Sequence, residues 1–240
     1  MLRFGRPHRH YKVTDSTNER ARELAVAGAP SGTVVTAAEQ TAGRGRADRR
    51  WSAPVGEALL YSAIVRPLGP EYTLLPLAVP LAVCEAVEAL APVRCALKWP
   101  NDVWIDERKV AGVLIDARPP EWAVIGIGLN VAIEAAAFPE DLRWPATSVG
   151  HAVTVEAARA ALDERLSAWA GAEAVRVLAA FRERDALAGR EVRWTGAGSD
   201  GGGAGTAAGV DSAGNLVVRV AGGATTSLGS GEVQLRIDRR

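Results

Sequence analysis

Hydrophobic and polar positions form two kinds of pattern along the first three quarters of the chain. Short runs rich in β-branched and apolar residues, bounded by turn residues, are typical of strands. A longer apolar run at residues 74–90 predicts a buried helix, which Pro76 and Pro80 kink or delay. An Ala/Arg/Glu-rich stretch at residues 155–187 predicts two helices that separate near Gly171. The predicted strands cover residues 9–13, 33–39, 58–65, 95–99, 110–117 and 122–131.

A further helix is predicted directly after the first strand. Small or apolar residues occupy positions 21, 24, 25 and 28, the i, i+3, i+4, i+7 spacing of one helical face. Ser16 and Glu19 have the S-x-x-E spacing of a capping box, in which each side chain bonds the backbone N–H of the other residue. We therefore expect the helix to begin just after Ser16.

The pattern changes after residue 188, where glycines become dense. Short alternating runs at residues 191–194, 215–220 and 232–237 predict a small β-barrel. We expect two domains, a larger one over residues 1–188 and a smaller one over residues 189–240.

Composition narrows the classes of function. The chain has 240 residues, and its 28 basic and 28 acidic side chains balance, so no overall positive field attracts nucleic acid. The longest strongly apolar run is too short to span a bilayer, and the basic N-terminus lacks the apolar stretch of a secretory signal. Cys84 and Cys95 show no metal-binding spacing and are interpreted as reduced core residues. These features predict a cytoplasmic protein without DNA or membrane partners.

The most informative segment is a Gly/Arg loop, residues 40–57, which has no apolar periodicity. Glycines let a backbone approach a ligand closely, and guanidinium groups match carboxylate and phosphate oxygens. Trp51 directly follows the arginines and suits a planar ligand such as adenine. A solvated basic loop or an RNA-binding tail is the alternative. No Walker or Rossmann phosphate-binding motif occurs. The arginines of the loop are Arg44, Arg46, Arg49 and Arg50.

A second candidate is the KWPNDV segment at residues 98–103. Asn101 suits contact with a nucleotide, and Asp102 offers the oxygen ligands that magnesium prefers. An Asn-Asp turn that closes a hairpin is the alternative.

Two strand segments also carry candidate residues. Lys109 leads into an almost wholly apolar strand, where an ammonium is costly unless it meets an anion or reaches the surface. Glycines inside the strand at residues 126–130 weaken it unless a ligand or a neighbouring backbone must come close. Asn130 then either bonds that ligand or simply ends the strand.

Five segments in this order resemble the biotin–protein ligase family: Ser16-Thr17-Asn18, Gly43-Arg44-Gly45-Arg46 with Trp51, Lys98 to Asp102, Lys109 to Gly112, and Gly126 to Asn130. The resemblance covers roughly residues 9–135 and, more weakly, the C-terminal glycine-rich part. It implies an α+β fold, in which a mixed-sheet catalytic domain like that of class II synthetases and lipoate ligases precedes a small SH3-like β-barrel.

The resemblance also implies an activity. ATP would activate biotin as biotinyl-5′-AMP, with Mg²⁺, and the biotinyl group would pass to a lysine of a biotin carboxyl-carrier domain. Arg46 and Lys109 would be catalytic, and Asp102 would bind the metal. The implied ATP-binding residues are Arg49, Trp51, Asn101 and Asn130. The implied biotin-binding residues are Ser16, Thr17, Asn18, Gln40, Arg44, Gly45, Arg46, Lys109 and Gly112.

Some features depart from the family or leave alternatives open. Asp116 stands where the family often has glutamate, so it receives no role. Family members that repress transcription carry a DNA-binding domain before the catalytic domain, and the short segment before residue 9 predicts the enzyme-only type. A lipoate or octanoate ligase is the main alternative, although its arginine motif resembles RRxSGG. A non-enzymatic regulator that binds biotin or nucleic acid is the other. The oligomeric state, including a homodimer, stays open.

Overall fold

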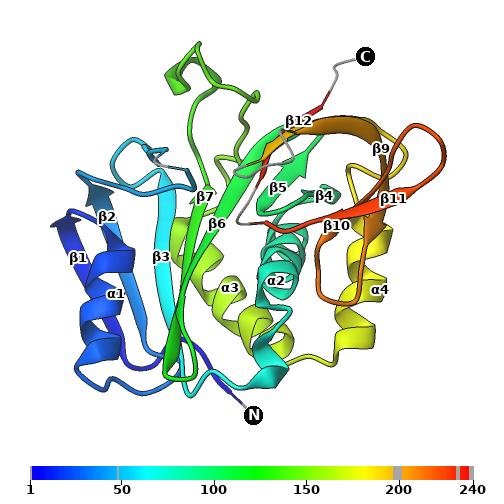
Figure 1. The fold of residues 1–240 in the computed structure, drawn as a ribbon. Coiled ribbons are helices and arrows are strands. Elements are labelled where there is room, and N and C mark those ends of the chain that lie inside the picture. Colours follow the sequence, from blue (N-terminus) through cyan, green and yellow to red (C-terminus); the bar gives the residue numbers. More distant parts are fainter. Residues whose placement is uncertain (1, 48, 197–201, 231–232, 238–240) are drawn as a thin grey trace.

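The computed structural model describes residues 2–47, 49–196, 202–230 and 233–237. Its larger unit is a seven-stranded mixed sheet in the order β1-β2-β3-β7-β6-β5-β4 (Figure 1). Only the β1–β2 pair is parallel among the neighbouring strands of this sheet. The strands are β1 (His8–Thr14), β2 (Val34–Gln40), β3 (Ala58–Val65), β4 (Cys95–Lys98), β5 (Asp102–Ile105), β6 (Arg108–Arg118) and β7 (Trp122–Asn130).

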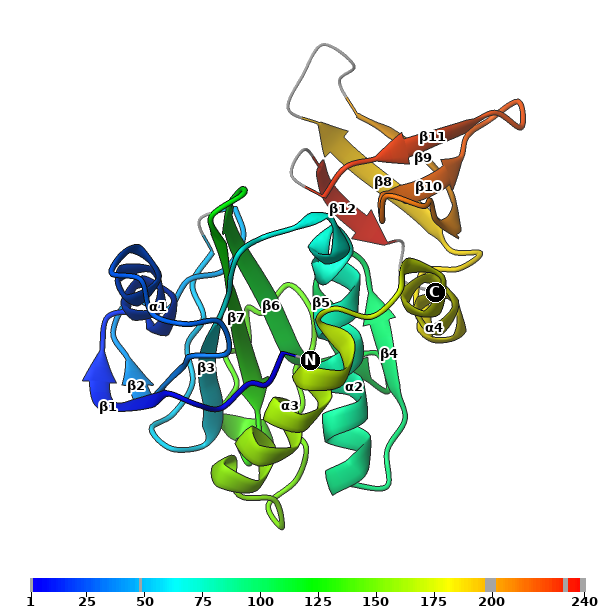
Figure 2. The same cartoon turned by 90° about the horizontal axis from the view of Figure 1, so that it is seen from below.

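Helices cover both faces of this sheet. Successive side chains of a strand point to opposite sides, so each face contributes its own apolar side chains to a core beneath the helices. On β3, Ile64 packs into a small core beneath α1, whereas Leu59 and Tyr61 belong to the large core beneath α2 and α3. Figure 2 shows α1 on one side of the sheet and α2 and α3 on the other. The helices are α1 (Thr17–Val26), α2 (Leu75–Leu90), α3 (Val155–Trp169) and α4 (Ala174–Arg184), with short 3-10 helices η1 (Pro70–Tyr72) and η2 (Ala135–Ala137).

The C-terminal unit is a five-stranded antiparallel sheet in the order β11-β10-β9-β8-β12. Its apolar side chains, among them Val192 and Leu216, join the large core of the first unit. The indole Nε1 of Trp99 also donates to the carbonyl oxygen of Gly214 at 3.1 Å. The strands are β8 (Glu191–Gly196), β9 (Gly203–Val210), β10 (Leu216–Arg219), β11 (Thr225–Leu228) and β12 (Val233–Ile237).

The predicted α+β class is confirmed, and each predicted strand and helix has a counterpart in the structure. Three strands were not predicted. Asp102, the first residue of β5, was interpreted as part of a turn, and β9 and β11 are too poor in large apolar residues to show a pattern. Gly28 lies beyond the end of α1 with a φ of +86°, so it is not part of the helix face. The boundary at residue 188 stays a prediction.

None of the helices in the described ranges has the length and apolar character needed to cross a membrane. Within the same ranges, no group of three or more His, Cys, Asp or Glu side chains is arranged to hold a metal ion. Cys84 and Cys95 are buried, free thiols.

Candidate active site

A cavity of about 460 Å³ opens where the Gly/Arg loop, the start of α1 and the loop after β7 meet the sheet. This volume lies within the usual range for small-molecule sites. With the exception of Asp102, every site residue predicted above lines this cavity: Ser16, Thr17, Asn18, Gln40, Arg44, Gly45, Arg46, Arg49, Trp51, Asn101, Lys109, Gly112 and Asn130.

One end of the cavity is lined mainly by uncharged polar side chains. The Thr17 backbone N–H donates to Gln40 Oε1 at 2.7 Å, and the Thr17 hydroxyl lies 3.0 Å from the same oxygen. Asn18 is only 5% exposed, and its Nδ2 donates to Asp116 Oδ2 at 3.3 Å. Ser62, which is fully buried, contacts both Thr17 and Asn18. Buried polar groups need such partners, so this end is a preorganised hydrogen-bonding surface.

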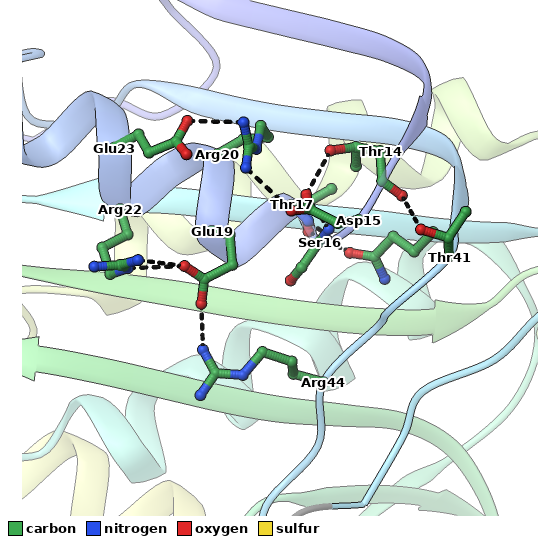
Figure 3. Close-up of polar contacts among 11 residues, drawn as sticks. Thr14, Asp15, Ser16, Thr17, Glu19, Arg20, Arg22, Glu23, Thr41 and Arg44 are labelled. Carbon is green, nitrogen blue, oxygen red and sulfur yellow. Dashed lines mark hydrogen bonds and ion pairs between the residues drawn. The ribbon is translucent and has the colours of Figure 1, made fainter.

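The capping box predicted at the start of α1 is wrong. Ser16 is the N-cap residue, but its side chain makes no capping hydrogen bond. The carboxylate of Glu19 instead accepts from Arg22 and, at 2.6 Å, from Arg44 of the Gly/Arg loop (Figure 3). The side chain of Arg44 also lies 3.6 Å from Asp116. Two carboxylates therefore hold the beginning of the loop against α1 and β6.

The glycines of β7 make room for side chains. From the sequence, we expected a ligand or a neighbouring backbone to approach them instead. A Cβ atom on Gly126 would lie 2.1 Å from Asn18 Oδ1, and one on Gly128 would lie 2.3 Å from the Trp51 ring. Gly112 of β6 pairs directly with Gly128, so two glycines form a flat floor beneath this indole. The Trp51 Nε1 is buried and has no partner among the described residues. An unsatisfied donor at a cavity wall points to a missing acceptor from a ligand.

The opposite end of the cavity is cationic. Lys109 Nζ lies 2.6 Å from Asp102 Oδ1 and 5.5 Å from the centroid of the Trp51 ring. The second oxygen of Asp102 lies 3.4 Å from Lys98 Nζ, and both Asp102 and Lys98 are about 5% exposed or less. Burial alone would raise the pKa of Asp102, but the charges of Lys109 and Lys98 outweigh it and lower the pKa. Burial lowers the pKa of Lys98, against the opposing effect of Asp102.

Arg46 brings a second cation to this end. Burial lowers the pKa of its guanidinium, and the positive charge of Arg49 lowers it further. In the described part of the chain, Arg46 has no carboxylate within ion-pair distance. A partly buried cation without a counter-ion favours an anionic ligand.

Asp102 does not fit the predicted magnesium site. It lies outside the lining of the cavity, and each of its oxygens faces a lysine ammonium. Magnesium needs oxygen ligands in an octahedral arrangement, and two ammonium groups in their place repel it. The geometry favours a carboxylate that holds Lys109 in position.

Asn101 and Asn130 line the cavity and also fix its walls. Asn101 Nδ2 donates to the Val113 carbonyl oxygen at 2.8 Å, which ties the turn between β4 and β5 to β6. Asn130 Nδ2 donates to the Thr147 carbonyl oxygen at 3.0 Å. The segment around Ala146 pairs beside Lys109 as an isolated bridge, so Asn130 anchors the loop after β7.

The sequence did not single out several residues that the structure brings to the site. Phe138, Arg143 and Trp144, from the loop after β7, line the cavity. Trp144 packs on Trp104 at 5.5 Å between ring centroids and lies over the Lys98 ammonium. An Arg-Trp pair beside a proline in a loop was the only local signal. Ser62 and Asp116 contribute through contacts distant in sequence, which no local pattern shows.

Comparison with known proteins agrees with this geometry. The sequence profile of the biotin/lipoate A/B protein ligase family matches residues 10–130. The chain is 39% identical over 140 residues to the bifunctional ligase/repressor BirA of Bacillus spizizenii, across 55% of this chain and 42% of that protein. It is 40% identical over 125 residues to the biotin–[acetyl-CoA-carboxylase] ligase of Mycobacterium tuberculosis, across 49% and 47% respectively.

The aligned parts therefore span less than half the length of these curated relatives. Among solved structures, the biotin protein ligase of Aquifex aeolicus in complex with biotin and ATP superposes with a TM-score of 0.83 and 28% identity, over 98% of this chain and 100% of that one. The chain belongs to the biotin/lipoate A/B protein ligase family.

Proposed function

We propose that this chain is a biotin–protein ligase that activates biotin with ATP and transfers it to a lysine of a biotin carboxyl-carrier domain. The observation that carries the proposal is the polarity of the single cavity described above. One end offers neutral hydrogen-bonding groups around Thr17 and Asn18, and the other offers the cations Arg46 and Lys109. Biotin has the same polarity, with an uncharged cyclic urea at one end and a carboxylate at the other.

The polar end favours biotin over lipoate. A urea presents one carbonyl acceptor and two N–H donors, so it needs donors and acceptors together. Thr17, Asn18 and Gln40 supply amide and hydroxyl groups of both kinds. The dithiolane ring of lipoate has no N–H donor and only weak acceptors, so it cannot match these groups as a urea does, which discriminates against such an analogue.

The cationic end suits adenylate formation. A biotin carboxylate oxygen forms a bond to the α-phosphorus of ATP, and the bond from that phosphorus to the β-bridging oxygen breaks. Pyrophosphate leaves with the electron pair. Two anions must approach each other, so Arg46 and Lys109 lower the barrier by offsetting negative charge. Arg49, Trp51, Asn101 and Asn130 are proposed to bind the nucleotide.

Magnesium enters the proposal as the counter-ion that ATP phosphates carry, and no residue of the chain is assigned to it. Asp102 is assigned to Lys109 because their 2.6 Å contact fixes the ammonium at the cavity wall.

The second step is aminolysis of the adenylate. The neutral amine of the acceptor lysine forms a bond to the biotinyl carbonyl carbon, the bond to the phosphate oxygen breaks, AMP leaves with the electron pair, and one proton of the amine is released to solvent. Residues of the Gly/Arg loop line the cavity, and Arg44 ties the loop to α1, so we expect this wall to protect the anhydride from water until the acceptor arrives. A role for residues 1–188 as the catalytic domain, and a cytoplasmic location, remain predictions.

One incubation tests the proposal. The chain is mixed with ATP, Mg²⁺ and a biotin carboxyl-carrier domain, with either biotin or lipoate, and the carrier is weighed by mass spectrometry. We expect a gain equal to one biotinyl group with biotin and no gain with lipoate. A gain with lipoate alone would instead support a lipoate ligase. No gain with either acid would contradict the proposed function.

A further inference from the structure

We propose that Ser62 is a positioning residue that sets the donor and acceptor order of the polar end of the cavity. The inference rests on the proposed function and deepens it, because it names what makes that end specific for a cyclic urea. Ser62 lies in the middle of β3 and is fully buried. It is absent from the cavity lining, so it does not touch a ligand there.

The sheet register places Ser62 beneath Asn18. Ser62 pairs directly with Gly126 of β7, so the two residues share one face of the sheet. Gly126 has no side chain, and a Cβ atom there would meet Asn18 Oδ1 at 2.1 Å. Because Gly126 has no side chain, the Asn18 amide packs directly against the sheet, and its Oδ1 lies 2.6 Å from Ser62 Oγ.

The Ser62 hydroxyl has a single proton and two oxygen neighbours. Asn18 Oδ1 can only accept, so it takes this proton. The 2.8 Å contact between Ser62 Oγ and Thr17 Oγ1 is then completed by the Thr17 proton. Gln40 Oε1 keeps the Thr17 backbone N–H as its donor at 2.7 Å. Ser62 thus fixes the direction of the Thr17 proton, for which Gln40 Oε1 at 3.0 Å is the alternative acceptor.

The same contact fixes the direction of the Asn18 amide. Its oxygen faces the Ser62 donor, and its Nδ2 faces the Asp116 carboxylate, which only accepts, at 3.3 Å. An amide between a donor and an acceptor has one favourable orientation. Without Ser62, the amide oxygen loses its buried partner, and the amide and the Thr17 hydroxyl both regain rotational freedom. A ligand then has to order them on binding, which weakens its affinity.

Ser62→Ala tests this role in the full chain, with Ser167→Ala as the matched control. Ser167 in α3 also makes two hydrogen bonds, accepting from the Phe4 N–H and donating to the Asp163 carbonyl oxygen, but lies outside the cavity lining. Biotin and ATP binding are measured separately by calorimetry, and KM and kcat by pyrophosphate release. For Ser62→Ala we expect the Kd and KM for biotin to rise about tenfold, while the values for ATP and kcat stay within about twofold.

Ser62→Cys provides a second variant of nearly the same shape if the alanine variant does not fold. A thiol is a weak donor, so biotin affinity should fall here too, by about threefold to tenfold. Biotin affinity equal to that of Ser167→Ala in either Ser62 variant would overturn the inference. Equal losses for biotin and ATP would also overturn it, because they indicate a general structural defect. If the unaltered chain binds no biotin, the proposed function itself fails.

Discussion

The two ends of the cavity are built on different principles. At the polar end, short hydrogen bonds among α1, β2 and β3 hold Thr17, Asn18 and Ser62, and the Asp116 carboxylate holds Asn18 from the other side. At the cationic end, Asp102 is shared by two lysines, and Arg46 is half-buried without a carboxylate among the described residues. The contrast suggests that the polar end recognises a ring of fixed geometry, whereas the cationic end stabilises charge that develops during reaction.

Among the substitutions considered, removal of the Lys109 side chain should reduce the rate of biotin activation most. We expect Lys109→Ala to slow biotin-dependent pyrophosphate release by about a thousandfold, because a preorganised charge next to the reacting oxygens is lost. Biotin affinity should change far less, since the polar end is intact. Lys12→Ala, at an exposed lysine of β1, is the control. A rate within tenfold of the unaltered chain would exclude Lys109 as a principal catalytic group.

Asp102→Asn should lower the free energy of unfolding, because Lys98 and Lys109 share the charge of this carboxylate. Two ammonium groups lose their buried anion, which costs about 3 kcal/mol of the free energy of unfolding at pH 7. The pKa of Asp102 is lowered in the folded state, so its stabilisation is complete above its unfolded pKa of about 3.9 and is lost as the pH falls through the folded value.

Urea unfolding of both proteins at pH 7 and pH 3 measures this effect. The difference between the unaltered chain and Asp102→Asn should shrink at pH 3, because this pH lies below the unfolded pKa of Asp102, so the unfolded chain takes up the proton and part of the stabilisation is lost. Asp106→Asn, at an exposed turn, is the control for the substitution itself. A difference that stays constant with pH would mean that Asp102 acts through packing alone.

Arg46→Ala should make the adenylate form slowly and escape. We expect formation to slow by about a hundredfold and biotinyl-5′-AMP to be released from the protein, because the loop loses its contact with the developing charge. Chromatography of quenched reactions distinguishes bound from free adenylate. Arg182→Ala, at an exposed position of α4, serves as the control. Unchanged turnover together with retained adenylate would contradict the assignment.

Two glycine substitutions in β7 should separate the two ends. In Gly126→Ala the new methyl group collides with Asn18, and in Gly128→Ala it collides with Trp51. Overpacking of this kind costs about 1–3 kcal/mol, so we expect about a tenfold loss of biotin affinity in the first variant and of ATP affinity in the second. Calorimetry with biotin and with ATP measures the two affinities of each variant. Equal losses of both ligands in both variants would show that the ends are not independent.

Much of the fold could be predicted from the sequence. Ala58–Val65 and Trp122–Asn130 are continuous apolar strands between turn residues, and the structure places β3 and β7 there. The strand β5 was missed because its first residue, Asp102, follows an asparagine and a proline and looks like a turn. The strand β9 contains only small residues and valine, so its burial depends on neighbours that the local sequence does not show.

The sequence motifs predicted most of the residues that line the cavity. They did not predict the contacts between residues that are far apart in the chain. Glu19 was assigned to a helix cap, but Arg44, twenty-five residues away, draws its carboxylate toward the loop. Ser62 is one hydroxyl in an apolar strand, and only the register with Gly126 reveals its neighbours. Asp102 is a residue type that commonly binds metals. The two lysines beside it belong to β4 and β6, and only the pairing of these strands with β5 brings them to its carboxylate.

The central claim is that the cationic end activates the acid which the polar end has selected. Exchange of labelled pyrophosphate into ATP measures that activation alone, without any acceptor protein. With the unaltered chain and Mg²⁺, we expect rapid exchange with biotin and none above background with lipoate, octanoate or no acid. Exchange that proceeds equally with lipoate, or that does not depend on biotin, would contradict it.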